Sequence, residues 1–95
     1  MTPLTRDSAE VLAIEALSWL AGQEDLIGVF LGSTGASVTD LRERARDPEF
    51  LASVLDFLLM DDAWITEFCD AADYKPDFPM RARAALPGGA QQNWT

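Results

Sequence analysis

The stretch DPEFLASVLDFLLMDD, residues 47–62, decides the fold of this chain. It opens with an aspartate and a proline, a pair that starts a helix because the missing N–H of proline costs nothing in the first turn. On a helical wheel the polar residues Glu49, Ser53 and Asp56 share one narrow stripe, and apolar side chains fill the remaining positions. We therefore predict a helix over residues 48–60 that is buried on nearly every side. Asp61 or Asp62 is expected to cap the next helix.

The segments on either side also have helical periodicity, and none shows the strict alternation of a half-buried strand. Asp7 or Ser8 is expected to cap a first helix that stops at Gly22, and its wide apolar face is typical of a central helix. The other expected helices cover residues 24–31, 38–46, 62 to the break at YKPDFP (74–79), and 79–86. The sequence predicts a compact, single-domain, all-α bundle of five or six short helices over residues 1–95, with an ordered core at about 7–86 and a tail at 87–95.

The composition limits the classes of function. Ninety-five residues are enough for one core, and the net charge is −9. Eight acidic residues and no lysine or arginine occur between positions 47 and 74. A field of this sign repels nucleic acids and anionic membranes. No apolar run reaches the roughly 18 residues that span a bilayer, and the first ten residues lack a signal-peptide pattern. A soluble, cytoplasmic protein is expected.

The side chains that carry most enzyme chemistry are scarce. The chain has no histidine and one cysteine, so a histidine base, a histidine metal site and an internal disulfide are all excluded. Cys69 falls on the inward face of its expected helix, where a buried structural thiol is the expected role. We expect no catalytic residue, no metal and no cofactor, and we do not expect an enzyme.

The stretch FLGSTGASVTDLRERAR, residues 30–46, has the glycines and hydroxyls of a phosphate-binding loop. It lacks the lysine that a P-loop requires after its last glycine, and helix rather than strand is expected before it. The preferred interpretation is a hinge, in which Gly32 or Gly35 ends one helix while Ser37 and Asp40 form a capping box for the next. The alternative is a small-ligand or anion site at residues 32–40, formed by Ser33, Thr34, Ser37, Thr39, Arg42 and Arg46.

The outward carboxylates suggest a surface that binds another protein. The expected contact residues are Asp56 on one helix, Asp62, Asp70 and Asp73 on the next, and Trp94 in the tail. Trp94 has two interpretations, since it either docks on the bundle or anchors a partner. The sequence thus favours an interaction or regulatory module with an acidic helical surface and a basic protein partner, with the anion binder as the alternative. Direct binding of nucleic acid is not expected.

Several segments together resemble a known family. TRDSAEVLAIEALSWLA, DLRERARDPEFLASVLDFLLMDD, FCDAA and the closing RARAALPGG resemble a family of short bacterial proteins classed as a domain of unknown function. The resemblance extends from about Ala9 to Thr95. It implies a small helical protein, and it brings no assigned activity and no catalytic residues.

Overall fold

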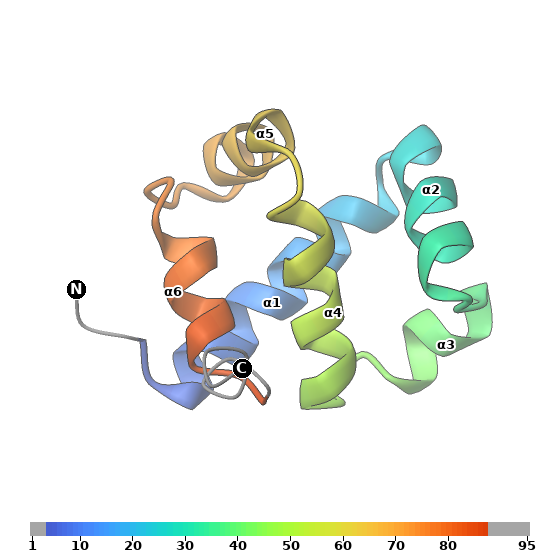
Figure 1. Ribbon diagram of the computed structural model, residues 1–95, viewed down its shortest axis with the longest axis horizontal. Helices are drawn as coiled ribbons and strands as arrows, with labels where there is room; N and C mark the ends of the chain where they lie inside the picture. The colour runs from blue at the N-terminus through green and yellow to red at the C-terminus, as the bar shows by residue number, and fades with distance from the viewer. Residues whose placement is uncertain (1–3, 88–95) are drawn as a thin grey trace, which may run out of the picture.

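The chain folds into six α-helices, as the computed structural model shows for residues 4–87, the part of the chain described here (Figure 1). No strand occurs among these residues, so the all-α prediction is confirmed. The helices are α1 (Arg6–Ala21), α2 (Glu24–Thr34), α3 (Val38–Glu43), α4 (Pro48–Leu58), α5 (Asp62–Ala72) and α6 (Phe78–Ala84).

Helix α1 lies at the centre and packs against α2, α4, α5 and α6. In Figure 1 it passes behind α6 and α4, with α5 above and α2 to one side. Ala9, Ala13 and Ala16 on its inner face are fully buried. These small side chains let neighbouring helices come close, and larger residues such as Leu12 and Leu20 fill the space between them. The prediction of a central first helix is confirmed.

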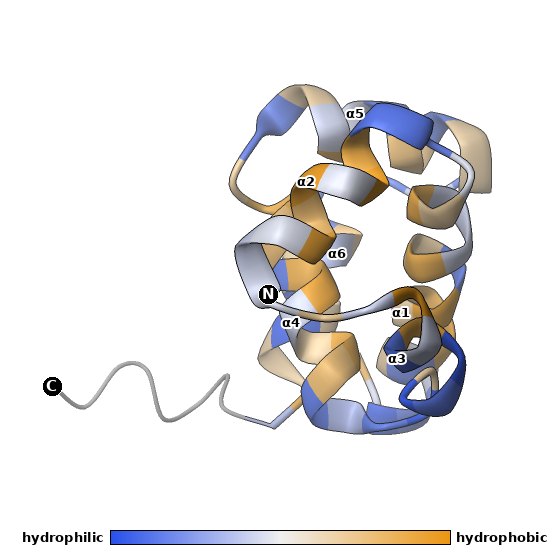
Figure 2. Ribbon diagram, turned by 90° about the vertical axis from the view of Figure 1, so that its right-hand side faces the viewer, coloured by the Kyte–Doolittle hydropathy of each residue, from blue (hydrophilic) through white to orange (hydrophobic). Residues whose placement is uncertain are grey.

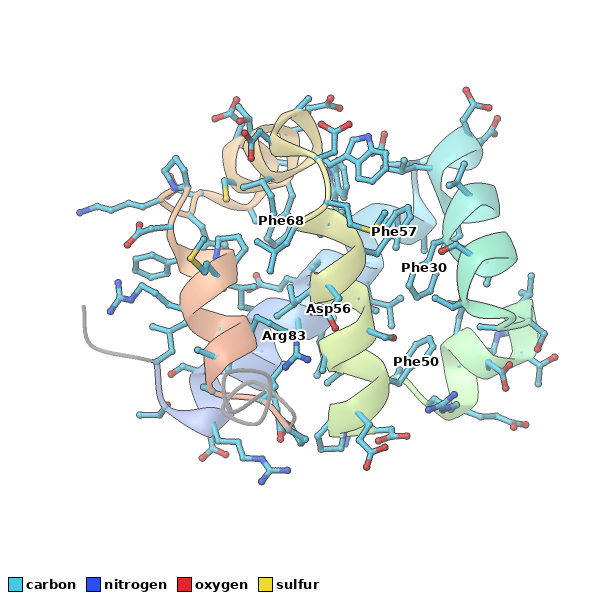
Figure 3. All side chains as sticks on the ribbon, in the orientation of Figure 1. Phe30, Phe50, Asp56, Phe57, Phe68 and Arg83 are labelled. Atoms are coloured by element: carbon cyan, nitrogen blue, oxygen red, sulfur yellow. The ribbon has the colours of Figure 1, made fainter. Side chains whose placement is uncertain are left out.

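Helix α4 is buried on most sides, as its sequence predicts. A run of aromatic rings joins it to its neighbours, and Figure 3 labels Phe30, Phe50 and Phe57 in this run. The Phe30 ring from α2 meets the edges of Phe50 and Phe57, with centroids 6.0 Å and 5.3 Å away. Phe57 then stacks on Trp64 of α5 at 4.8 Å. The seven buried residues of α4 are Phe50, Leu51, Ala52, Val54, Leu55, Phe57 and Leu58.

A second run of aromatic rings packs between α1, α5 and the start of α6. Trp19 of α1 packs edge-on against Phe68 of α5, and Tyr74 and Phe78 continue the run to the start of α6, with centroid distances of 5.7–6.0 Å. Figure 2 shows hydrophilic residues at the top of the molecule, where α2 begins and α5 lies. The two runs of rings tie α2, α5 and the start of α6 to the central pair α1 and α4.

Several of the expected helix boundaries differ from the structure, and α4 ends at Leu58 rather than at residue 60. Thr5, rather than Asp7 or Ser8, caps α1 by accepting a hydrogen bond from the Ser8 N–H at 3.1 Å. Helix α2 continues three residues beyond Leu31, to Thr34. Helix α6 covers Phe78–Ala84 rather than 79–86, because the last residues turn more tightly, with bonds to the third residue back.

The predicted third helix is too long, since α3 ends at Glu43 and not at Arg46. Residues 44–47 form a turn closed by a bond of 2.9 Å from the Asp47 N–H to the Arg44 carbonyl. Asp47 then caps α4, and a residue before proline is disfavoured in helical geometry. The start of α4 therefore dictates the end of α3.

The predicted hinge at residues 32–40 is confirmed. Gly35 ends α2 in a left-handed conformation with φ 74°, whereas Gly32 lies inside the helix. The Ser37 hydroxyl accepts from the Asp40 N–H, and the Asp40 carboxylate accepts from the Ser37 N–H, which completes the capping box. The two glycines thus have different backbone roles, although a methyl group at either would meet no atom within 4 Å.

This contrast gives a matched pair of substitutions. Gly35→Ala is expected to lower the free energy of unfolding by about 1 kcal/mol, because alanine is strained at positive φ. Gly32→Ala is expected to raise it by about 0.5–1 kcal/mol, since alanine is the better helix former. Urea denaturation followed by circular dichroism measures both. Equal effects of the two substitutions would contradict the assignment of the turn to Gly35.

Candidate functional site

Asp56 differs from the other carboxylates predicted to contact a partner, because it forms an ion pair within the fold. Arg83 of α6 is 8% exposed, and its Nε donates to Asp56 Oδ1 at 2.6 Å. The Arg83 Nη1 donates to the Pro87 carbonyl at 3.0 Å. Figure 3 shows the pair between α4 and α6. Asp56 therefore neutralises a nearly buried cation. No local sequence pattern predicts this pair, because its two residues are 27 positions apart.

The predicted acidic residues of α5 lie where the sequence places them. Asp62 and Asp70 are exposed on its outer side, and Asp73 is exposed at its end. None of the three forms an ion pair within residues 4–87. Asp73 has an additional structural role, because it ends α5 in a left-handed conformation with φ 64°.

An open hollow of about 490 Å³ lies between α5 and the beginning of α2. Its rim carries the carboxylates of Glu24, Asp25 and Glu67, and its apolar lining comes from Leu26, Val29 and Trp64; Gly22 and Gln23 complete it. We call this hollow the acidic groove. No local sequence pattern predicts the acidic groove, because the two halves of its rim are more than 40 residues apart in the chain.

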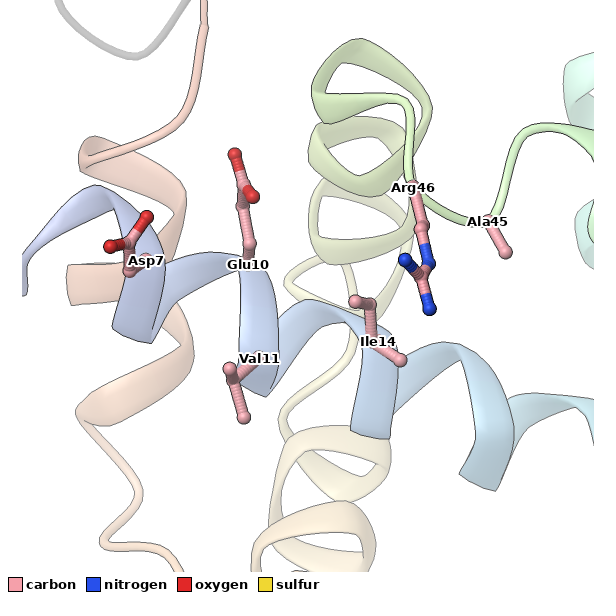
Figure 4. Close-up of a pocket in the computed structure, with 6 residues that line it drawn as sticks. All are labelled: Asp7, Glu10, Val11, Ile14, Ala45 and Arg46. Carbon is pink, nitrogen blue, oxygen red and sulfur yellow. The ribbon is translucent and has the colours of Figure 1, made fainter.

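A second surface runs along the outer side of α1 and meets α3. It consists of two adjoining open hollows of about 410 Å³ and 370 Å³ that share Ile14 and Ala45. Figure 4 shows the first, with Asp7, Glu10, Val11 and Ile14 along α1 and Arg46 pointing toward them. The second is lined mainly by apolar groups, from Ile14, Leu17, Ser18, Ala21, Val38, Leu41, Arg42 and Ala45. We call the whole surface the α1 groove.

Exposed apolar residues mark this surface, with Val11 56% and Ile14 40% exposed. The α1 groove does not follow from the prediction of a central helix, because that prediction places the wide apolar face of the helix in the core. The signal that would have found it is the spacing of Asp7, Val11, Ile14, Ser18 and Ala21, which places a second stripe opposite the buried one.

The residues of the alternative anion site do not gather in one place. Arg42 and Arg46 line the α1 groove, in separate hollows. The Thr34 hydroxyl donates to the Phe30 carbonyl at 2.8 Å and accepts from the Ala36 N–H at 3.3 Å, so it serves the helix end. Ser33, Ser37 and Thr39 are exposed. A hollow of about 280 Å³ beside the turn is lined by Thr34, Gly35, Ala36, Asp40, Arg44, Glu49, Phe50 and Ser53, which includes two carboxylates. The anion site stays a prediction.

Two other titratable groups lie in the packed region around α5. The Cys69 thiol is buried and donates to the Lys75 carbonyl at 3.6 Å; burial, with the nearby carboxylates of Asp70 and Asp77, raises its pKa. The Tyr74 hydroxyl donates to Glu15, and burial together with this carboxylate raises the pKa of Tyr74 to about 12. Both groups are therefore protonated at neutral pH. Within residues 4–87 no three side chains of the His, Cys, Asp and Glu types are grouped to hold a metal ion.

The fold and these surfaces define a class, a small all-helical domain that carries the acidic groove and the α1 groove on its surface. The chain belongs to the family described as protein of unknown function DUF3572, whose model matches residues 6–89. The resemblance to a family of unknown function is thereby confirmed. No curated protein and no solved structure matches the chain. None of the helices in the described part of the chain has the length and hydrophobicity needed to cross a membrane. The predicted contact residue Trp94 lies outside the described residues.

The ion pair between α4 and α6 gives a stability prediction. Asp56→Asn removes the charge opposite Arg83, and we expect it to lower the free energy of unfolding by about 1–3 kcal/mol, between the values for exposed and buried pairs. Asp70→Asn removes an unpaired carboxylate and should change that free energy by less than about 0.5 kcal/mol. Urea denaturation measures both. If the two variants had the same stability, Asp56 would be free to serve a partner.

The hydroxyl of Tyr74 can be titrated directly, because it is the only tyrosine in the chain. Absorbance near 295 nm should show phenolate forming with a midpoint near pH 12 rather than near 10. The folded protein binds the Tyr74 proton more tightly than the unfolded chain does. The protonated hydroxyl therefore contributes to the free energy of unfolding, and this contribution is fully present below about pH 10 and is lost as the pH rises toward 12. Glu15→Gln should lower the midpoint, and an unchanged midpoint in this variant would refute the contact with Glu15.

Proposed function

We propose that this protein is an interaction module whose acidic groove binds a basic segment of another protein. The observation that carries the proposal is the acidic groove itself, because it joins three carboxylates to an exposed apolar surface between α2 and α5. A partner that supplies lysine or arginine beside an apolar side chain would match both features.

The carboxylates of the groove are available to a cation. Glu24, Asp25 and Glu67 are exposed, and none forms an ion pair within residues 4–87. The outer carboxylates Asp62 and Asp70 extend the negative surface along α5. With a net charge of −9, the whole chain attracts a basic partner from a distance and raises its association rate.

The apolar part of the groove can anchor such a partner. Trp64 is half-buried and is held by its stacking on Phe57, so its exposed edge is already in place. Val29 beside it is 53% exposed. Rigid aromatic residues are frequent at the centres of protein interfaces, because they bury a large area and lose little conformational entropy. The expected partner is therefore a short basic segment with one or two apolar residues that reach Trp64 and Val29.

The anion binder is the second candidate, and it has less support. An anion at residues 32–40 would meet the carboxylate of Asp40, which already accepts the Ser37 N–H. Titration with inorganic phosphate, followed by amide NMR shifts, tests it. Shifts confined to Gly32–Asp40 would favour this candidate, and an unchanged spectrum would remove it.

The acidic groove can be tested with a synthetic lysine–leucine peptide and a glutamate–leucine peptide of the same length. In NMR titrations we expect the basic peptide to shift the Trp64 indole and the amides of Glu24–Val29, and we expect the acidic peptide to leave them unchanged. Neutralising the rim by Glu24→Gln, Asp25→Asn and Glu67→Gln should weaken binding about tenfold, which corresponds to about 1.4 kcal/mol.

A matched triple variant separates the groove from net charge. Asp7→Asn, Glu43→Gln and Glu49→Gln change the total charge equally, at exposed positions away from the acidic groove. This variant should bind the basic peptide nearly as well as the natural chain. An equal loss of binding in both triple variants would show that net charge alone attracts the peptide, and the proposal would then be wrong.

A further inference from the structure

Helix α1 has a second stripe that no helix within residues 4–87 covers. Asp7, Val11, Ile14, Ser18 and Ala21 are all exposed and follow one another at intervals of four, three, four and three residues. This is the spacing at which one helix packs along another. The residues on the opposite side of α1 are buried in the core. The exposed stripe is therefore a second side of the helix that another helix could contact.

The stripe continues into the wall formed by α3 and the turn after it. Val38 and Leu41 of α3 and the following Ala45 flank the apolar half of the α1 groove. From Asp7 to Ala21 the surface extends about 21 Å, at 1.5 Å per helical residue. A single additional helix, lying along α1, would match this length and fill the groove.

The charges of the groove define the polarity of that additional helix. Asp7 and Glu10 stand at one end of the groove, Arg42 lines the other end, and Arg46 points toward Ile14 between them (Figure 4). Glu10 pairs with Arg6, whereas Asp7 and Arg42 form no ion pair within residues 4–87. The matching helix carries an acidic residue at the Arg42 end and apolar residues in the middle. The chain contains such a helix, because α1 itself presents Asp7, Val11 and Ile14 in this order.

We propose that the α1 groove is the interface of a two-fold symmetric dimer, in which α1 of a second copy lies antiparallel across α1. With the axis at Ile14, position 7 of one copy faces position 21 of the other, since the paired numbers add to 28. Asp7 then approaches Arg42 of the second copy, and symmetry repeats this pair at the other end. The small residues Ser18 and Ala21 leave room for the acidic end of the second helix.

The dimer is weak by this account. A helix of 16 residues is about 24 Å long and offers a contact smaller than the roughly 800 Å² per partner of a typical stable complex. The net charge of −9 on each copy also opposes association. A dissociation constant in about the micromolar range is expected. The acidic groove lies on α2 and α5, whereas the dimer interface lies on α1 and α3. A negative result for the dimer therefore does not contradict the proposed function, and a negative result for the acidic groove does not contradict the dimer.

Sedimentation velocity of the full chain, from about 5 to about 500 μM, tests the proposal. The sedimentation coefficient should rise with concentration from monomer to dimer. Ile14→Glu places a charge on the axis and should keep the chain monomeric throughout, with an unchanged circular dichroism spectrum. Met80→Glu changes an exposed apolar residue on α6, away from the α1 groove, and this variant should dimerise as the natural chain does.

A charge exchange tests the antiparallel arrangement. Asp7→Arg alone and Arg42→Asp alone should each weaken the dimer, because like charges then face each other at both ends. An equimolar mixture of these two variants should dimerise again, since each end regains an opposite pair and the summed charge equals that of two natural chains. A monomer at every concentration would overturn the proposal, and so would a dimer that survives Ile14→Glu or a mixture that stays monomeric.

Discussion

The structure depends on the close packing of four helices around α1. One helix can contact so many neighbours only if its inner side chains are small where backbones approach and large where they diverge. Ala9, Ala13 and Ala16 meet the first requirement, and Leu12, Leu17 and Leu20 meet the second. Helix α4 supplies the opposite half of this core, and the rings of Phe30 and Phe57 join it to α2.

The same constraint explains why apolar surface remains outside. A chain of 95 residues has too little material to cover every side of a central helix, since small domains bury a smaller share of their surface than large ones. Val11 and Ile14 on α1 and Val29 on α2 are left exposed as a result. We propose that these exposed side chains take part in binding, Val29 in contact with a basic partner and Val11 and Ile14 in contact with a second copy. Asp56 has a structural role in the fold, because its carboxylate neutralises Arg83.

Much of the fold followed from local sequence patterns, and the surfaces did not. The Asp47–Pro48 start of α4, the capping box at Ser37 and the central position of α1 were all predicted, since each depends on residues within one or two turns of each other. The end of α3 was missed because the turn that prepares α4 overrides helical periodicity. The Asp56–Arg83 pair and the rim of the acidic groove join distant segments, so periodicity carries no information about them.

Residue-resolved hydrogen exchange in increasing urea tests the central role of α1 most directly. If every helix depends on α1, the amides of Leu12–Leu17 should exchange only through global unfolding, with the free energy measured by urea denaturation. The amides of α3, which contributes no buried residue, should exchange through smaller openings. An α1 that opens at lower free energy than α4 or α6 would contradict the account, because the other helices would then hold together without it.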